Sequence, residues 1–281
     1  MTYIDPMLSY PLYQAVILAL VQGLTEFLPV SSSAHLDLFP WLFGWEDPGL
    51  SFDIALHLGT LFAVLAYFCR DWWRLLAHGF GLRSGGDPDL DANPLLLWLL
   101  AAATVPAVIA GLFLHNAAET TLRQPLIYGP MLIAVALLML WAEYVARQDR
   151  GIRSIGLWDS IYIGVAQAVA LIPGVSRSGI TISAGLSRGY DRASAARFSF
   201  LLSTPAIAGA AAMTAYKLHK AGGIPPRMHT AFLVGFLVSA LTGTVVVAFL
   251  MRFLRHHTMR IFVLYRVVLG ILIIALALFR R

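Results

Sequence analysis

Residues 21–35 read Val-Gln-Gly-Leu-Thr-Glu-Phe-Leu-Pro-Val-Ser-Ser-Ser-Ala-His, an apolar run that carries one acid, breaks at a proline and ends in serines and a histidine. Residues 166–181 read Ala-Gln-Ala-Val-Ala-Leu-Ile-Pro-Gly-Val-Ser-Arg-Ser-Gly-Ile-Thr and have a related shape. A glutamine, Gln22 or Gln167, lies nine residues before the first serine of each stretch. The three serines at 31–33 therefore align with residues 176–178. We infer that the chain uses one motif twice, once in each half.

The composition is typical of a helical membrane protein. Of the 281 residues, 59% are hydrophobic and 12% are charged, with a mean hydropathy of +0.75, whereas about a quarter of a soluble domain is charged. The single cysteine, Cys69, excludes an internal disulfide and argues against a thiolate metal cluster. We interpret the net charge of +5 as charge of cytoplasmic loops and expect no nucleic-acid partner. The first ten residues lack a basic region, so we expect no cleaved signal peptide.

Each motif predicts a re-entrant hairpin. The segment 34–44 that follows the first serines has 11 residues, which as a helix span ~16 Å, about half of a ~30 Å hydrocarbon core. We therefore interpret residues 11–44 as a hairpin with the serines at its tip, and residues 156–188 as its repeat. Irregular backbone at that depth persists only where protein or a wet cavity surrounds it.

Three longer apolar runs follow each hairpin, and each is long enough to span a membrane. They cover residues 52–70, 95–115 and 126–146 in the first half, and 196–216, 229–251 and 261–279 in the second. A hairpin returns to its own side and three spans cross over, so the second half enters from the opposite face. The sequence predicts an all-α polytopic membrane protein with an inverted-topology repeat, in one membrane domain (1–281) with halves 1–147 and 148–281. In such a design the special site lies near the midplane, where the broken helices meet.

The distribution of basic residues predicts the orientation. Twelve arginines lie in loops on the side opposite the N-terminus, and six lysines and arginines lie on the N-terminal side. Because cytoplasmic loops carry an excess of Lys and Arg, both termini are expected to face outward, into the periplasm. The two remaining basic residues, Arg177 and Arg266, fall inside predicted membrane segments.

Arg177 at the second tip indicates an anion site. An arginine at membrane depth costs at least ~2.5–3.5 kcal/mol and needs an anionic partner, and its forked donors suit phosphate. Each tip also opens a helix, whose N-terminal N–H groups attract anions. If the two tips meet, they surround a phosphate pocket inside the membrane. The alternative is that Ser31, Ser32, Ser33 and Ser176 merely cap the short helices, which leaves Arg177 unexplained.

Glu26 and His35 are the titratable candidates near the first tip. Glu26 could form a structural ion pair with Arg177, hold a divalent metal, or assist a proton transfer beside a diphosphate. Because the hairpin holds one acid before the tip, a two-metal cage is not expected, and a metal would lean on substrate oxygens. His35 could be a nucleophile, a general base or a general acid. Asp37, at the mouth, and His57, at the border of the site, are weaker candidates.

At these stretches the sequence resembles the undecaprenyl-diphosphate phosphatase family of the bacitracin-resistance type. The similar segments extend over nearly the whole chain and are residues 24–35, 58–60, 173–181, 198–202 with Pro205, and Tyr265-Arg266. The resemblance implies a bacterial inner-membrane enzyme that removes the terminal phosphate of the C55 polyprenyl diphosphate. The lipid carrier is thereby recycled for peptidoglycan and other envelope polymers. Sequestration of the diphosphate by bacitracin links the family to resistance.

The resemblance, taken together with the chemistry of the two tips, leads to expected roles for single residues. Catalysis is expected to involve Glu26, Ser32, His35 and Arg177. Substrate binding is expected to involve Gln22, Ser31, Ser33, Ser176, Ser178 and Thr181. A divalent cation, Mg²⁺ or Ca²⁺, is the expected cofactor, with Glu26 as its protein ligand. Many members have a glutamate where this chain has Gln22, which weakens a two-carboxylate metal site, and His57 stands where a glutamine is common.

Together these residues predict phosphoryl transfer at the membrane interface, achieved by positioning and charge neutralisation. Arg177, the tip amides and the hydroxyls would hold the diphosphate, while the polyprenyl tail lies between spans in the bilayer. Whether Ser32, His35 or water attacks stays open, and so does assembly as a homodimer. The alternative is a lipid-phosphate flippase or an anion transporter, because inverted repeats with broken helices are a transporter design. A carrier, however, needs no nucleophile or proton donor, and a purely structural protein needs no repeated polar tips.

Overall fold

The computed structural model describes residues 10–46, 48, 50–82, 85–119, 122–220 and 222–279. Within these ranges every regular element is a helix, as the composition predicts. The two chain ends, for which the charge count predicts an outward orientation, lie outside the described residues.

In each half the predicted pair of short helices comes first and the predicted longer helices follow, with two further short helices among the longer ones of the first half. The first half contains α1 (Leu12–Thr25), α2 (Ser32–Phe43), α3 (Leu50–Tyr67), α4 (Cys69–Gly79), α5 (Pro88–Asp91), α6 (Leu96–Glu119) and α7 (Pro125–Val145). The second half contains the 3₁₀ turn η1 (Ile152–Ser154), α8 (Leu157–Val169), α9 (Arg177–Ser187), α10 (Arg192–Lys220), the 3₁₀ turn η2 (Pro226–Met228), α11 (His229–Phe253) and α12 (Arg260–Phe279).

Five helices are long and apolar enough to cross a membrane by themselves, namely α6, α7, α10, α11 and α12. The sixth predicted span, residues 52–70, is α3, which passes the same test together with α4 across a bend of 72°. The prediction of an all-α polytopic membrane protein is thereby confirmed. The sequence analysis did not predict α4, because its Arg70, Asp71 and Arg74 interrupt the apolar pattern.

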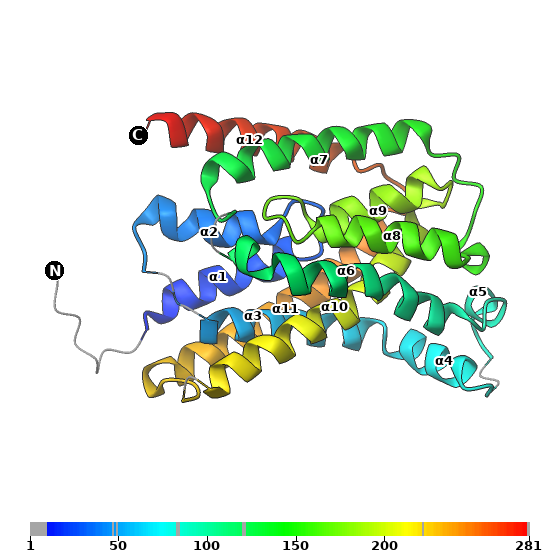
Figure 1. Ribbon diagram of the computed structural model, residues 1–281, viewed down its shortest axis with the longest axis horizontal. Coiled ribbons are helices and arrows are strands. Elements are labelled where there is room, and N and C mark those ends of the chain that lie inside the picture. Colours follow the sequence, from blue (N-terminus) through cyan, green and yellow to red (C-terminus); the bar gives the residue numbers. More distant parts are fainter. Residues whose placement is uncertain are drawn as a thin grey trace.

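The two short-helix pairs approach each other from opposite ends of the bundle (Figure 1). α1 begins and α12 ends at the left-hand end of the view, whereas α8 begins at the right-hand end. The breaks between α1 and α2 and between α8 and α9 both lie in the middle of the molecule. This arrangement is the one expected for two re-entrant hairpins; the symmetry relation between the two halves stays a prediction.

Small residues let the helices behind the first hairpin pack closely. α11 packs against both α1 and α3. A Cβ atom at Gly59 of α3 would lie 2.5 Å from the Phe236 carbonyl oxygen, and one at Gly23 of α1 would lie 3.0 Å from the Ser239 carbonyl oxygen. Side chains at these two positions would push α11 away from α3 and from α1, the helix that leads into the first tip, which is why glycine is required there.

Both tips are anchored in the main hydrophobic core. Val30 is 4% exposed and Val175 is 1% exposed, and each directly precedes the first serine of its tip. Phe27 packs edge-to-face against Phe200 of α10, with ring centroids 5.7 Å apart. These apolar contacts fix the irregular backbone, so that the polar groups of the tips are held in defined positions.

Candidate active site

The two tips share an unusual backbone conformation. Ser31 has φ = 76° and Ser176 has φ = 73°, so both lie in the left-handed region that residues with a Cβ rarely adopt. α2 begins directly after the first of these serines and α9 directly after the second. The N–H groups in the first turn of a helix have no intrahelical acceptor. The Ser176 hydroxyl caps that of Gly179 at 3.2 Å, whereas the Ser31 side chain caps none, and the remaining N–H groups are donors that the tips present. Backbone strain of this kind is typical of functional sites.

The structure brings the tips into direct contact. The Ser178 hydroxyl donates to the Leu28 carbonyl oxygen at 3.1 Å, and the Gly174 N–H donates to the Ser33 hydroxyl at 3.4 Å. The guanidinium of Arg177 forms an ion pair with Glu26. Residues about 150 positions apart in the sequence therefore form one site, as the paired motif predicts.

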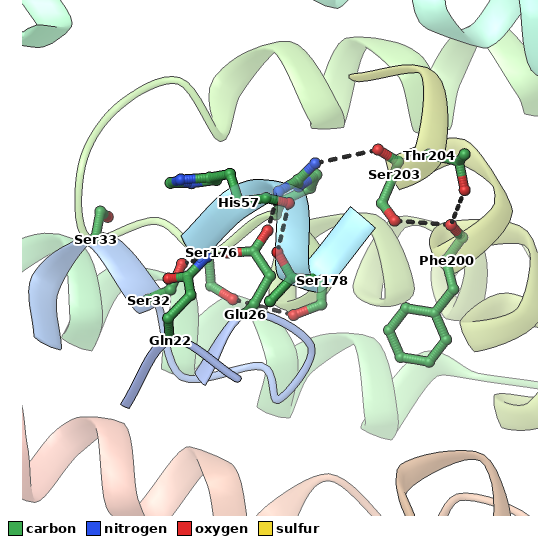
Figure 2. Close-up of polar contacts among 12 residues, drawn as sticks. Gln22, Glu26, Ser32, Ser33, His57, Ser176, Ser178, Phe200, Ser203 and Thr204 are labelled. Atoms are coloured by element: carbon green, nitrogen blue, oxygen red, sulfur yellow. Dashed lines mark hydrogen bonds and ion pairs between the residues drawn. The ribbon is translucent and has the colours of Figure 1, made fainter. Parts of the chain in front are cut away.

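The Glu26 carboxylate is the centre of this site (Figure 2). Its side chain is almost entirely buried. Oε1 accepts from Arg177, while Oε2 accepts from the Ser32 hydroxyl at 2.7 Å and from the Gln22 amide at 3.1 Å. A hydroxyl that donates to a carboxylate at this distance has the geometry of a nucleophile with its general base.

A cavity of about 240 Å³ opens beside Glu26. Six of the predicted site residues line it, and they are Glu26, Ser31, Ser32, Ser33, Ser176 and Arg177. The rest of the wall is formed by His57, Gln167 and apolar residues of α6, of α10 and of the segment that follows α8, namely Ala107, Ala170, Leu171, Ala206, Ile207 and Ala210. One side of the cavity is therefore polar and cationic, and the other is apolar.

Four predicted site residues lie behind this wall rather than in it. Gln22 donates to Glu26. Ser178 bonds to the opposite tip, and Thr181 donates to the Arg177 carbonyl oxygen at 2.7 Å and bonds to Ser199 at 2.6 Å. These three side chains support the residues that face the cavity. Asp37, the weaker candidate, bonds to Tyr128 and Arg123 and lines a different cavity.

His35, the fourth, is buried and uses both ring nitrogens. Nδ1 lies 2.7 Å from the Ser31 carbonyl oxygen, and Nε2 lies 2.6 Å from the Tyr265 hydroxyl. Because a carbonyl only accepts, Nδ1 carries the proton, and the neutral ring accepts from Tyr265 through Nε2. In this arrangement His35 holds the backbone of Ser31, next to the hydroxyls that line the cavity.

In the described part of the chain, the charged guanidinium of Arg266 is hydrogen-bonded entirely to backbone carbonyl groups. It is fully buried, and no carboxylate among the described residues pairs with it. It donates to carbonyl oxygens of both tips and of α7, namely Pro29 at 3.2 Å, Gly174 and Val175 at 3.0 Å, Leu132 at 3.1 Å and Met131 at 3.5 Å. The guanidinium thus joins the two tips from behind the cavity.

Two further polar residues line the cavity wall. Gln167 was not predicted as a site residue, and His57 was a weaker candidate. Both amide atoms of Gln167 are buried without a hydrogen-bond partner among the described residues. The repeat alignment with Gln22 was the signal for this position. His57 borders the cavity as expected, and its Nδ1 lies 2.8 Å from the Asp53 carbonyl oxygen of its own helix. The other ring nitrogen, Nε2, has no hydrogen-bond partner among the described residues.

The residues around Glu26 fit one hard divalent cation. No group of three or more His, Cys, Asp or Glu side chains among the described residues could hold a metal. Glu26 nevertheless supplies a carboxylate, Ser32 a hydroxyl, and Gln22 an amide oxygen that is buried without a hydrogen-bond partner in the described structure. Oxygen donors of this kind suit Mg²⁺ or Ca²⁺ when substrate oxygens complete the shell. A two-metal cage does not fit one carboxylate.

Comparison with known proteins shows the family of the chain. The family model described as "Bacitracin resistance protein BacA" matches residues 15–272. The chain is similar to the undecaprenyl-diphosphatase of Desulforudis audaxviator, with 48% identity over 95% of this chain and 98% of the relative. It is also similar to the undecaprenyl-diphosphatases of Thermodesulfovibrio yellowstonii (47% identity; 96% and 99%) and Pelotomaculum thermopropionicum (46% identity; 96% and 98%). The chain therefore belongs to the bacitracin resistance protein BacA family.

Proposed function

We propose that this protein hydrolyses undecaprenyl diphosphate to undecaprenyl phosphate and inorganic phosphate in the bacterial inner membrane. The relatives named as undecaprenyl-diphosphatases support the reaction. The observation that carries the proposal is the Glu26 carboxylate, which is bonded at once to the guanidinium of Arg177 and to the hydroxyl of Ser32. A candidate base, a candidate nucleophile and an anion-binding group thus meet at one carboxylate.

The diphosphate would enter the polar side of the cavity. Its charge would be met by Arg177 and by the free N–H groups at the start of α2 and α9. Arg177 would transfer from Glu26 to the phosphate, which releases Oε1 of the carboxylate. The polyprenyl chain would leave along the apolar wall formed by α6, α10 and the segment that follows α8, where small residues such as Ala107 and Ala210 leave room.

In the chemical step Glu26 would accept the proton of the attacking hydroxyl, either that of Ser32 or that of a water molecule held in its place. The oxygen–phosphorus bond forms at the terminal phosphate while the bond to the bridging oxygen breaks, and undecaprenyl phosphate departs. If Ser32 attacks, water then hydrolyses the phosphoserine. Arg177 and the tip N–H groups would stabilise the charge on the transferred group.

A bound divalent cation would be held by Glu26, Gln22 and Ser32, and it would neutralise charge on the phosphate oxygens. The inner-membrane location, the periplasmic side for both termini, and assembly as a homodimer are part of this proposal. Recycling of the carrier lipid accounts for the link to the cell wall and to bacitracin resistance. The transporter alternative receives no support from the relatives, and it assigns no role to the bond between Ser32 and Glu26.

Phosphate release from C55 diphosphate by the purified full chain in detergent tests the proposal, with and without EDTA. We expect release by the wild type and loss of release in Ser32→Ala and Glu26→Gln, while Ser183→Ala, a buried serine outside the cavity, serves as the matched control. If phosphate release persists in EDTA, the proposed cation is wrong and the proposed phosphatase activity stands. If folded wild-type protein releases no phosphate with any divalent ion, the proposed phosphatase activity is wrong.

A further inference from the structure

We propose that a basic cavity binds the phosphate headgroup of an anionic phospholipid. The cavity lies at the end of the bundle where α8 begins, and α1 begins at the opposite end. This cavity of about 490 Å³ lies where α7 and α9 end and the η1 connection begins. Its wall is formed by Val145, Arg147, Asp149, Arg150, Ser187, Arg188 and Gly189. In Figure 1 the end of α7 and the start of α8 both lie at the right-hand end of the molecule, away from the central tips.

Arg147 and Arg188 line this cavity with guanidinium N–H groups that could bind a phosphate. Arg188 donates through Nε to Asp159 at 2.6 Å, and its two terminal nitrogens have no hydrogen-bond partner among the described residues. Arg147 is exposed and forms no hydrogen bond or ion pair within the described structure. The Nε bond to Asp159 orients the fork of Arg188, which is the geometry for binding two oxygens of one phosphate.

Arg150 has a different task in the same cavity. It donates to the carbonyl oxygens of Arg188 and Ser154 and to Asp159, at 3.0, 3.1 and 2.7 Å. Its guanidinium also lies over the ring of Tyr190, 4.3 Å from the centroid. Both terminal nitrogens of Arg150 are therefore bonded within the protein. Arg147 and Arg188 remain as the cationic groups that a ligand would meet, beside the exposed carboxylate of Asp149.

The surroundings of the cavity indicate a membrane lipid rather than a soluble anion. Val145, in its wall, is the last residue of the membrane-crossing helix α7. The neighbouring Tyr144 is 89% exposed, and Trp158 in the first turn of α8 is 78% exposed. Tyr162 lies beneath Arg188 and bonds to Ser187 at 3.3 Å. Exposed aromatic residues together with arginine at the end of a spanning helix are typical of the headgroup level of a bilayer, where basic residues attract anionic lipids.

A lipid in this position would have a defined structural effect. Arg147 follows α7, and Arg188 follows α9, the second limb of the second hairpin. A headgroup held by both would tie the base of that hairpin to a membrane-crossing helix. We therefore expect the lipid to stabilise the folded protein without contacting the active site.

The test is lipid binding by the purified full chain, measured by native mass spectrometry with phosphatidylglycerol and phosphatidylcholine of equal chain length. Wild type should bind phosphatidylglycerol in preference, and the thermal unfolding midpoint should rise with that lipid alone. Arg147→Gln, which breaks no described contact, should lower the apparent affinity about fivefold. Arg147→Gln/Arg188→Gln should lower it further, and Arg255→Gln, a charge-matched change at an exposed residue outside this cavity, should not.

Three results would overturn the site. The first is equal binding of both lipids by the wild type. The second is unchanged preference in Arg147→Gln/Arg188→Gln protein whose midpoint in phosphatidylcholine confirms that it is folded. The third is the same stabilisation by inorganic phosphate in solution, which would assign the cavity to a soluble anion.

Discussion

Arg266 donates a hydrogen bond from Nη2 to the carbonyl oxygen of Val175 at 3.0 Å. All described peptide bonds are trans, so the N–H of the same peptide unit, that of Ser176, points away from Arg266. This N–H has no acceptor among the described residues, and Ser176 lines the cavity. We infer that Arg266, which does not touch the cavity, positions a backbone donor for a phosphate oxygen.

Replacing Arg266 is therefore expected to reduce kcat. Arg266→Met removes the donor that fixes the Val175–Ser176 peptide, and loss of one oriented donor costs roughly 100-fold. Arg266→Lys keeps a charge and part of the hydrogen bonding, so it should recover part of the rate. The measurement is kcat and KM on monodisperse protein.

A purely structural role would give a different pattern. It would lower the thermal midpoint and the folded fraction while the rate per folded molecule stays unchanged. Wild-type kcat in folded Arg266→Lys and Arg266→Met would contradict the positioning role. Comparison of the unfolding midpoints of both variants in the same detergent separates the two interpretations.

Arg177 and Glu26 make a second prediction possible, because each neutralises the other. Arg177→Ala should abolish phosphate release and leave the buried Glu26 carboxylate unpaired, at a cost of at most about 3 kcal/mol of unfolding free energy. Adding Glu26→Gln to that variant should restore the thermal midpoint but not the activity. A double variant as unstable as Arg177→Ala would contradict the mutual neutralisation, and wild-type-like release by Arg177→Ala would contradict the phosphate pocket.

His35 can be tested by substitutions that imitate one ring nitrogen at a time. The amide introduced by His35→Asn would stand near the place of Nδ1 and could still donate to the Ser31 carbonyl oxygen, whereas the longer amide of His35→Gln imitates Nε2, which faces Tyr265. If His35 positions the first tip, His35→Asn should keep turnover within about tenfold of the wild type and His35→Gln should not. If His35 transfers a proton, both variants should be inactive.

Tyr265→Phe is the matched control for the His35 series. It removes the hydroxyl that bonds to Nε2 and leaves the bond from Nδ1 to Ser31 in place. Turnover close to the wild-type value is expected for a positioning role. A loss as large as that of His35→Ala would show that Nε2 is the nitrogen that matters.

Asp87, outside the membrane-crossing helices, makes stability depend on pH. Burial alone would raise its pKa, but the hydrogen bond and charge of Arg197 and the N–H groups of Leu90 and Asp89 outweigh burial and hold the pKa below its ordinary value. A carboxyl with a lowered folded pKa stabilises the protein above its unfolded pKa of about 3.9, and this contribution is lost as the pH falls through the folded value.

The thermal midpoint of the wild type should therefore fall as the pH drops below about 5 and go on falling until the pH is below the lowered folded pKa of Asp87. Asp87→Asn should start lower at pH 7, because Arg197 and Arg74 lose an anionic partner. Its additional loss on acidification should be smaller than that of the wild type. Parallel pH curves for the two proteins would contradict the assignment.

Much of this architecture was predictable from sequence, because proline and serine interrupt apolar runs at equivalent places. The hairpins predicted at 11–44 and 156–188 correspond to α1–α2 and α8–α9. The meeting of the tips followed from the repeated motif and from the need of Arg177 for an anion. Contacts made through backbone atoms were not predictable: the carbonyl partners of Arg266 leave no side-chain signature.

Other features depend on residues that are distant in the sequence. His35 was expected in the cavity because it follows the serines, yet it is turned towards Tyr265, 230 positions later. The bend between α3 and α4 arises where charged residues interrupt an apolar run. In each of these cases a tertiary contact or a change of solvent decides the local geometry, and a linear pattern does not contain that information.

The ion pair between Glu26 and Arg177 has a consequence for how such a protein can be divided. The first half supplies the carboxylate of Glu26 and the hydroxyl of Ser32, and the second half supplies the guanidinium of Arg177. Neither half by itself therefore contains a complete site. Two inactive chains, one lacking the acid and one lacking the cation, would complement each other only if they exchanged halves. Activity in such a mixture would therefore report exchange of halves within the membrane, and its absence would show that each molecule assembles from its own chain.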